Sequence, residues 1–321
     1  MGRYISRQLT SIIPTILLSI VINFFLLRAA PGDPARVMAG RDNPTEEQIA
    51  AIRAELGLDQ PLPVQFWRYV QELAQGNLGQ SIAFKQPVFD LIMERMPATL
   101  LLTLTSAVIA LTVGTLLGAI AAQRAGGPLD STLSFGNYAL FAIPSFWLGL
   151  VMIVIFSSKL GWLPTAGMRN VRADYTGWRD TLDVIQHMIL PVATLALVQI
   201  PIYFRITRAS VLQQQREDYV TTFRATGMPQ PRVFRRYALR NALLPTVTVF
   251  GLGLGFVFTG AALVEIVFAW PGIGRLTLDA VFRRDYPLLL GVYLVLAIAV
   301  SIAVLLTDIV YALLDPRIRL R

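Results

Sequence analysis

Six long segments of the chain contain no Asp, Glu, Lys or Arg. They are residues 8–27, 96–123, 131–158, 188–204, 241–264 and 287–307. About 20 apolar residues in a helix are enough to cross the hydrocarbon core of a bilayer. The pattern therefore predicts an all-α polytopic membrane protein with six transmembrane helices. The first segment exceeds the roughly 7–15 apolar residues of a cleaved signal peptide, so we expect this helix to be retained.

The composition agrees with this prediction and excludes several other classes of protein. The chain is 55% hydrophobic and 15% charged, whereas soluble domains are about 45–50% apolar and about 25% charged. It has no cysteine, which excludes a disulfide framework, a thiolate metal site and a cysteine nucleophile. The only histidine, His187, cannot form a zinc site that needs two or three imidazoles. We expect no metal site and no cofactor bound by this chain.

The basic residues are divided unevenly between the two ends of the predicted helices. The net charge of +8 by itself also allows a nucleic-acid partner. With the N-terminus in the cytoplasm, the cytoplasmic segments carry 14 basic and four acidic side chains, and the outer segments carry 14 of each. Cytoplasmic loops of membrane proteins have such an excess of Lys and Arg. We therefore predict cytoplasmic N- and C-termini, a lipid bilayer around the helices and no nucleic-acid partner.

Two connecting segments are long enough to fold. The outer segment between the first two helices contains a helix-like piece, residues 45–56, which opens with Thr-Glu-Glu as a helix N-terminus prefers. We expect it to belong to a folded external loop. The cytoplasmic segment 207–240 contains a second helical piece that begins near Glu217 and Asp218 and ends at Gly227.

These features divide the chain into three parts. Residues 1–94 hold the first transmembrane helix and the external loop with its short helices. Residues 95–313 hold a five-helix core that includes the cytoplasmic segment 207–240, and residues 314–321 form a basic cytoplasmic tail.

The chain carries no nucleotide-binding motif of the phosphate-loop type. That motif, G-x-x-x-x-G-K-[ST], needs a lysine that reaches the phosphates. The only two lysines, Lys85 and Lys159, do not follow a glycine. ATP hydrolysis that drives transport would therefore take place on a separate subunit, and we expect no catalytic residue here.

Two carboxylates at membrane depth leave a second class of transporter open. Proton- or ion-coupled carriers keep ionisable residues near the middle of the bilayer. Glu265 and Asp308 are the only acids at that depth, and each lies near the end of a span. A carboxylate bonded to a neighbouring helix would explain either residue, and a stand-alone ion-coupled secondary transporter is the alternative. A membrane-embedded hydrolase is not supported, since no Gly-x-Ser-x-Gly motif occurs.

Small residues and prolines interrupt several spans. The spacing of Gly114 and Gly118 lets a second helix approach closely, which indicates a multi-helix bundle or a subunit interface. Pro144, Pro191 and Pro201 break the backbone hydrogen-bond ladder, which at membrane depth is tolerated where protein or a water-filled path satisfies the freed carbonyl.

Arginines concentrate in segment 207–240. Attraction to anionic lipid headgroups would explain them. The segment also places apolar side chains such as Val220 and Phe223 between charged ones, which a purely electrostatic tether does not require. A short amphipathic helix of this kind, below the membrane, is typical of a docking element.

Several short motifs follow one another along nearly the whole chain. Segment 207–240 and the residues after it contain Glu217-Asp218-Tyr219-Val220-x-Thr222-x-Arg224-Ala225-x-Gly227 and Ala238-Leu239-Arg240-Asn241-Ala242-Leu243-Leu244-Pro245. Earlier motifs are Ala30-Pro31-Gly32-Asp33-Pro34, Pro97-Ala98-Thr99-Leu100 and Pro144-Ser145-Phe146-Trp147-Leu148-Gly149. Later ones are Glu265-x-x-Phe268-x-Trp270-Pro271-Gly272-x-Gly274-Arg275 and Leu314-Asp315-Pro316-Arg317. In this order and spacing they resemble the permease subunits of binding-protein-dependent ABC importers, in particular the peptide/nickel subgroup.

The resemblance implies a type I ABC importer permease fold in the bacterial cytoplasmic (inner) membrane. It implies a coupling loop that seats in the ATPase, formed by Glu217, Asp218, Tyr219, Thr222, Arg224, Ala225 and Gly227. It also implies an external gate that faces the binding protein, formed by Trp270, Pro271, Gly272, Gly274 and Arg275. An ordinary re-entrant turn would explain the second set as well. The chain departs from the family at Phe223, where a small residue is usual, and at Thr226, where a lysine is usual.

The function implied by the resemblance is that of a transport subunit rather than an enzyme. The chain would form half of the translocation pathway for dipeptides, oligopeptides or glutathione-like peptides, with nickel complexes as the alternative substrate. The implied partners are a second homologous permease subunit, two ABC ATPase subunits that bind ATP and Mg, and an external solute-binding protein.

Overall fold

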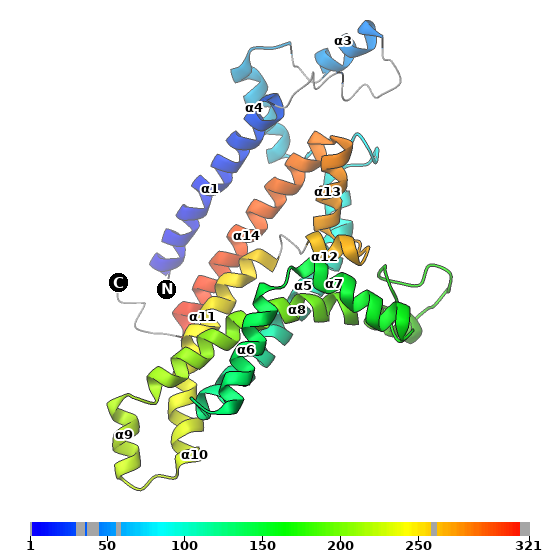
Figure 1. Ribbon diagram of the computed structural model, residues 1–321. Helices are drawn as coiled ribbons and strands as arrows, with labels where there is room; N and C mark the ends of the chain where they lie inside the picture. The colour runs from blue at the N-terminus through cyan, green and yellow to red at the C-terminus, as the bar shows by residue number, and fades with distance from the viewer. Residues whose placement is uncertain (1, 30–35, 37–44, 56–58, 258–261, 315–321) are drawn as a thin grey trace. The chain divides into compact units, whose positions relative to one another are not determined.

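The computed structural model describes residues 2–29, 36, 45–55, 59–257 and 262–314 (Figure 1). Their regular structure is helical, and the single β feature among them is an isolated bridge between Gln80 and Pro87. The prediction of an all-α chain is confirmed. The chain divides into two units, Met1–Pro97 with Gly272–Arg321, and Ala98–Pro271.

Three of the described helices are long and apolar enough to cross a bilayer, and they contain the second, fourth and sixth charge-free segments. They are α5 (Val88–Gln123), α8 (Trp178–Gln214) and the Tyr286–Leu305 part of α14 (Tyr286–Leu314). The first and fifth segments lie largely in α1 (Gly2–Ala29) and α11 (Leu239–Val257). The exact number of six transmembrane helices stays a prediction.

The third charge-free segment does not form one straight helix. It is divided between α6 (Pro128–Ala142) and α7 (Ser145–Met152), which continues as the π-helix η1 (Ile153–Lys159), and the two parts are bent by 102°. Pro144 has no backbone N–H and disfavours the helical conformation of the residue before it. Ile143 accordingly has φ −83° and ψ 126°, which ends α6.

The unit of Met1–Pro97 and Gly272–Arg321 is built around α14. Helix α1 packs along α14, where Asn23 Nδ2 donates a hydrogen bond to the Leu290 carbonyl at 3.2 Å. A second buried cluster joins the start of α5 to α13 (Ile273–Arg283) and α14 through Val88, Ile92 and Leu288. The buried carboxylate of Asp285 accepts bonds from Ser81 Oγ and the Ala83 backbone N–H, which fixes the turn before α5.

Two shorter helices of this unit lie in the loop that follows α1. Helix α3 (Glu46–Glu55) confirms the helix predicted for residues 45–56. Thr45 Oγ1 accepts the Gln48 backbone N–H, and Gln48 Oε1 accepts the Thr45 backbone N–H, so the two side chains cap the helix start reciprocally. Helix α4 (Leu62–Ala74) packs on α1, with the Phe66 and Phe24 ring centroids 5.1 Å apart.

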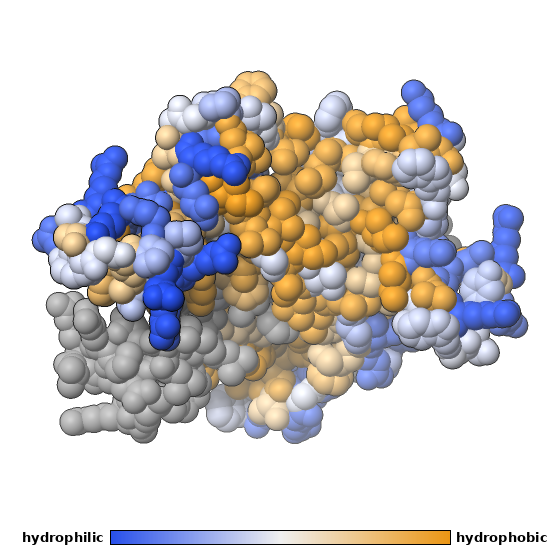
Figure 2. Space-filling model, turned by 90° about the horizontal axis from the view of Figure 1, so that it is seen from below, coloured by the Kyte–Doolittle hydropathy of each residue, from blue (hydrophilic) through white to orange (hydrophobic). Residues whose placement is uncertain are grey.

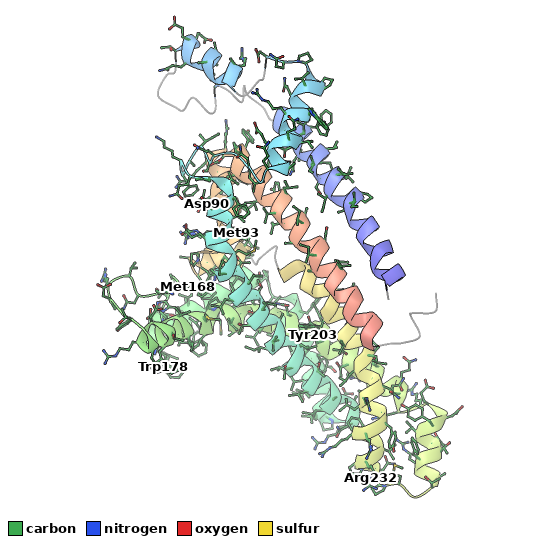
Figure 3. All side chains as sticks on the ribbon, turned by 180° about the vertical axis from the view of Figure 1, so that it is seen from behind. Asp90, Met93, Met168, Trp178, Tyr203 and Arg232 are labelled. Carbon is green, nitrogen blue, oxygen red and sulfur yellow. The ribbon has the colours of Figure 1, made fainter. Side chains whose placement is uncertain are left out.

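The unit Ala98–Pro271 is organised around α8, which packs against α6, α7, α11 and α12 (Ala262–Val267). Helix α5 also approaches α8 closely, because a Cβ at Gly114 would lie 2.7 Å from the Ile200 carbonyl oxygen, and one at Gly118 would lie 2.6 Å from that of Phe204. The close helix approach predicted from this glycine spacing is confirmed. Figure 3 shows Tyr203 on α8, Trp178 at one end of this helix and Arg232 beyond its other end.

Many large apolar side chains of α5 and α6 are exposed, among them Val108, Leu116 and Phe135. Figure 2 shows many exposed hydrophobic side chains on one face, with hydrophilic ones mainly at its margins. Soluble monomers rarely expose apolar patches of this kind, which mark membrane or protein contacts.

Candidate functional site

The predicted helix in segment 207–240 is present as α9 (Asp218–Ala225). Glu217 is its extended N-cap residue, and Asp218 lies in the first turn, where a negative charge is favourable. At the other end Gly227 has φ +78°, donates its N–H to the Arg224 carbonyl, and is followed by a Met228 N–H that reaches the Phe223 carbonyl. This pair of bonds is a Schellman cap, which explains why a glycine is needed at this position.

One face of α9 is fixed to the rest of its unit by apolar contacts. Val220, Val233 and Ala238 form a buried cluster that joins α9 to α10 (Gln230–Val233) and to the π-helix η2 (Phe234–Ala238). Phe223 packs on this cluster, and its ring centroid is 4.3 Å from that of Tyr237. The unusual aromatic side chain at residue 223 therefore fills space inside the 207–240 segment.

Tyr219 connects α9 with two long helices. Its hydroxyl donates a hydrogen bond to Gln214 Oε1 at 2.7 Å and accepts one from Asn241 Nδ2 at 3.3 Å. Gln214 is the last residue of α8, and Asn241 lies in the first turn of α11. A displacement of α9 would therefore act on α8 and α11 together.

The opposite face of α9 is exposed and polar. Asp218, Thr222 and Ala225 all lie on it, and Glu217 and Arg224 are exposed at the two ends of the helix. Thr222 Oγ1 donates a hydrogen bond along its own helix, to the Asp218 carbonyl at 2.9 Å. Of the seven residues predicted to form the coupling loop, Tyr219 and Gly227 shape and hold the helix, and the other five lie on its exposed surface.

An ion pair that the sequence analysis did not identify supports the end of α8. Arg208 Nε and Nη2 donate hydrogen bonds to Asp130 Oδ1 and Oδ2 at 2.6 and 2.7 Å. Asp130 is buried in the first turn of α6 and also accepts the Gly126 backbone N–H at 3.0 Å. The ion pair thus joins α6 to α8 two turns before the end of α8. No local pattern relates two residues so far apart in the sequence.

Trp270 and Pro271 end the unit Ala98–Pro271. The Trp270 side chain is fully buried, packs with Ala98, Leu102 and Val192, and donates its indole N–H to the Ala98 carbonyl at 2.8 Å. Its indole thus holds this segment against α5 and α8.

Gly272, Gly274 and Arg275 belong to the other unit. Gly272 is the N-cap residue of α13, with its carbonyl accepting the Leu276 N–H at 3.0 Å. Gly274 is buried and Arg275 is partly buried in the first turns of α13.

Of the two carboxylates predicted at membrane depth, the structure describes the side chain of Glu265. Glu265 is fully buried, and its Oε1 accepts a hydrogen bond from Thr99 Oγ1 at 2.9 Å. The side chain of Asp308 lies outside the described residues. Within the described part of the chain, no three His, Cys, Asp or Glu side chains come together as a metal site.

These features define a helical membrane protein in which the short helix α9 is fixed to two long helices. Residues 114–320 match the family described as binding-protein-dependent transport system inner membrane component, and residues 1–103 match the N-terminal family of the same transport systems. The chain belongs to this family of transport permeases. It is accordingly an integral inner-membrane protein and a transport subunit, as the sequence motifs predicted.

Three relatives are similar over nearly their whole length. The di/tripeptide transport system permease protein DppB of Pseudomonas aeruginosa is 40% identical, with 98% of each chain covered. The oligopeptide transport system permease protein AppB of Bacillus subtilis is 37% identical, with 99% of each chain covered. The glutathione transport system permease protein GsiC of Escherichia coli is 39% identical, again with 99% of each covered.

Proposed function

We propose that this chain forms half of the translocation pathway of an ATP-driven importer for small peptides. The names of its relatives support the peptide class, and the missing phosphate loop supports ATPase activity on separate subunits. A second, homologous permease forms the other half of the pathway. Two ABC ATPase subunits bind ATP and Mg, and an external solute-binding protein delivers the peptide. Nickel complexes are the alternative substrate. Uptake assays with a labelled peptide and with a nickel complex distinguish the two substrates.

The proposed orientation places both termini and α9 in the cytoplasm. Helix α8 has 37 residues, so it is about 55 Å long and exceeds the roughly 30 Å hydrocarbon core. It is long enough to cross the bilayer, and in the proposed orientation its two ends lie on opposite sides. The end that continues into α9 is the one close to the arginines of segment 207–240, which the positive-inside rule assigns to the cytoplasm.

Helix α9 is the proposed contact with the ATPase. The single observation that carries this proposal is the difference between its two faces. Its apolar face is occupied within the chain, whereas its polar face is exposed. Closure of the ATPase pair around ATP would push on the exposed face. The bonds from Tyr219 would transmit this displacement to α8 and α11, and the ion pair of Arg208 with Asp130 would carry it to α6.

The segment from Trp270 to Arg275 lies toward the other side of the membrane in this orientation. We propose that it forms the external gate. The Trp270 indole is buried, so Pro271 and Arg275, which are both partly exposed, rather than the indole would meet the binding protein.

Single cysteines test these assignments directly, because the chain has none of its own. Ala225→Cys in the assembled complex should cross-link to an ATPase subunit and be shielded from impermeant thiol reagents added outside intact cells. Val171→Cys, in the loop before α8, should react with those reagents and form no cross-link to the ATPase. The reverse pattern would exclude both the orientation and the docking role of α9.

A further inference from the structure

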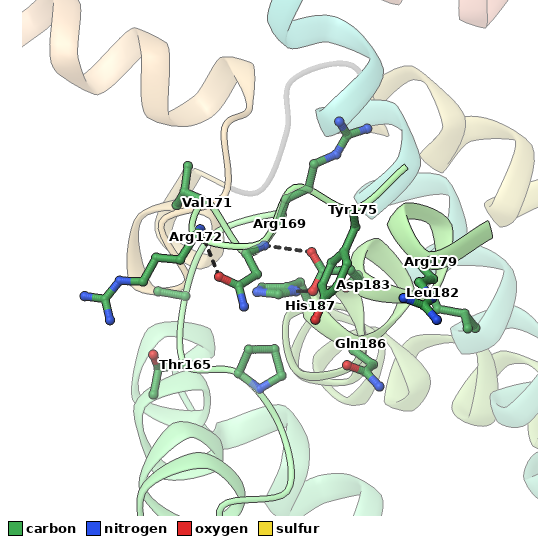
Figure 4. A pocket seen from close by; sticks show the side chains of 13 residues that line it. Thr165, Arg169, Val171, Arg172, Tyr175, Arg179, Leu182, Asp183, Gln186 and His187 are labelled. Atoms are coloured by element: carbon green, nitrogen blue, oxygen red, sulfur yellow. Dashed lines mark hydrogen bonds and ion pairs between the residues drawn. The ribbon is translucent and has the colours of Figure 1, made fainter. Parts of the chain in front are cut away.

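A loop and the start of α8 enclose an open cavity of about 900 Å³ in the unit Ala98–Pro271 (Figure 4). Its lining includes three arginines, Arg169, Arg172 and Arg179, and the apolar parts of Val171 and Leu182. Among the described residues that line it, Asp183 is the one that carries a carboxylate. Among the lining residues the arginines outnumber the carboxylates, although Asp180 pairs with Arg169 and the exposed Asp174 lies in the same loop. In the proposed orientation the positive-inside rule does not explain these arginines.

The loop is held in a defined conformation over α8. Asp183 is buried, and its Oδ2 accepts the Asn170 backbone N–H at 2.7 Å. His187 Nδ1 lies 2.8 Å from the Asp183 carbonyl oxygen and 3.4 Å from Asp183 Oδ1. The Gly167 N–H reaches the Phe268 carbonyl at 2.8 Å. The acidic side chain is thus used to fix the loop, and it does not neutralise the arginines at the rim.

Two of the three guanidinium groups have no carboxylate partner among the residues that the structure describes. Arg169 pairs with Asp180 at 3.3 Å, and its side chain is still 59% exposed. Arg172 and Arg179 are exposed and form no ion pair with another described residue. Figure 4 shows them on different sides of the cavity.

The loop and the start of α8 also carry exposed large apolar and aromatic side chains. Val171 at the loop tip is completely exposed, and Tyr175, Trp162 and Trp178 are also exposed large side chains. Trp, Tyr and Arg are the residues most enriched where protein partners bind tightly. Aromatic residues at the membrane surface would explain the tryptophans alone, but not Val171 together with three arginines.

We propose that this cavity receives a protruding acidic segment of the external solute-binding protein. The inference rests on the proposed function, which places the loop on the outer side. A single peptide carboxylate could not reach guanidinium groups on different sides of the cavity, whereas a surface with several carboxylates can. The arginines would accelerate and orient docking electrostatically, and the exposed aromatic and apolar side chains would be covered in the docked complex.

The test is carried out on the complete complex in lipid nanodiscs, with the solute-binding protein that supports uptake by the wild type. Titration of that protein gives its dissociation constant at 50 to 500 mM NaCl. The double variant R172E/R179E should raise this constant at least about tenfold at low salt and flatten its dependence on salt, because screening weakens exposed charge pairs. R172K/R179K should stay within about threefold of the wild type, since a point charge is sufficient at a rim.

Arg68→Glu is the matched control, because Arg68 is an exposed arginine of α4 in the predicted external loop. It should leave the dissociation constant unchanged. Equal affinity and salt dependence of R172E/R179E and the wild type would overturn the docking proposal. So would a double variant that docks normally but loses uptake, since the cavity would then take the peptide itself. Failure of the proposed function can be distinguished from failure of the docking proposal, because the wild-type complex itself would then show no ATP-dependent uptake.

Discussion

Arg208 holds Asp130 through two parallel hydrogen bonds of 2.6 and 2.7 Å, although 78 residues separate them in the sequence. The carboxylate is buried, and the guanidinium is about one-third exposed. Bidentate pairs of this kind fix the orientation of both side chains as well as their distance. The pair therefore makes the start of α6 and the last third of α8 move together, next to the helix that we propose contacts the ATPase.

Loss of the carboxylate charge should loosen this connection. In Asp130→Asn, Arg208 loses its charged partner, and we expect a stability loss of roughly 1–3 kcal/mol. Peptide uptake per ATP hydrolysed should fall several-fold, because α6 no longer follows α8. Thermal unfolding in detergent and the uptake-to-hydrolysis ratio in proteoliposomes measure the two effects. Arg208→Lys keeps the positive charge but cannot form the two parallel hydrogen bonds. An uptake-to-hydrolysis ratio as low as that of Asp130→Asn would show that these two bonds, and not the charge alone, are needed. Unchanged coupling in both variants would refute the connection.

The Tyr219 hydroxyl offers a narrower test of transmission through α9. Tyr219→Phe removes the bonds to Gln214 and Asn241 and keeps the ring in its cluster. Each lost bond is worth about 1 kcal/mol, so the complex should assemble, but uptake per ATP should decrease. Tyr293→Phe is the control, since Tyr293 is an exposed tyrosine of α14. A normal ratio in Tyr219→Phe would mean that α9 transmits its motion by packing alone.

Gly118 should tolerate no side chain. A Cβ there would lie 2.6 Å from the Phe204 carbonyl oxygen, so Gly118→Ala must push α5 away from α8 at a cost of about 1–3 kcal/mol. Gly136→Ala in α6 meets nothing within 4 Å and should be neutral or slightly stabilising. The midpoints of thermal unfolding of the two purified variants compare them. Equal midpoints would contradict the close approach of the two helices.

Glu265 should not be a coupling-ion site. Its carboxylate accepts a bond from Thr99 Oγ1, which the amide oxygen of Glu265→Gln can also accept. ATP-dependent uptake should therefore be largely retained and should not depend on a proton gradient. Uptake that follows an imposed gradient and disappears in Glu265→Gln would instead support an ion-coupled transporter.

Local features of the sequence predicted local structure well. The acids at Glu217 and Asp218 and the glycine at residue 227 delimit α9 correctly, because helix caps depend on neighbouring residues. The interruption of the backbone ladder at Pro144 was expected, but not the bend of 102° between two helices, since hydropathy reports the length of an apolar stretch and not its direction. The order of motifs predicted the family because it extends over nearly the whole chain.

Non-local contacts could not be predicted in the same way. Two features depend on which helices meet: the pairing of Arg208 with Asp130 and the arginine-lined cavity. The count of charges by side of the membrane assigned these residues to connecting segments and not to contacts. The place of Phe223 likewise became clear only with Tyr237 beside it. Tertiary packing decides such roles, and neither residue spacing nor composition contains them.

The most direct test of the proposed function is ATP-dependent peptide uptake by the reconstituted system. Proteoliposomes that contain this chain, the second permease and both ATPase subunits, with the solute-binding protein added outside, should accumulate a labelled dipeptide only when ATP is enclosed. Omission of the ATPase subunits should abolish accumulation. Accumulation by this chain without any ATPase subunit would contradict the account.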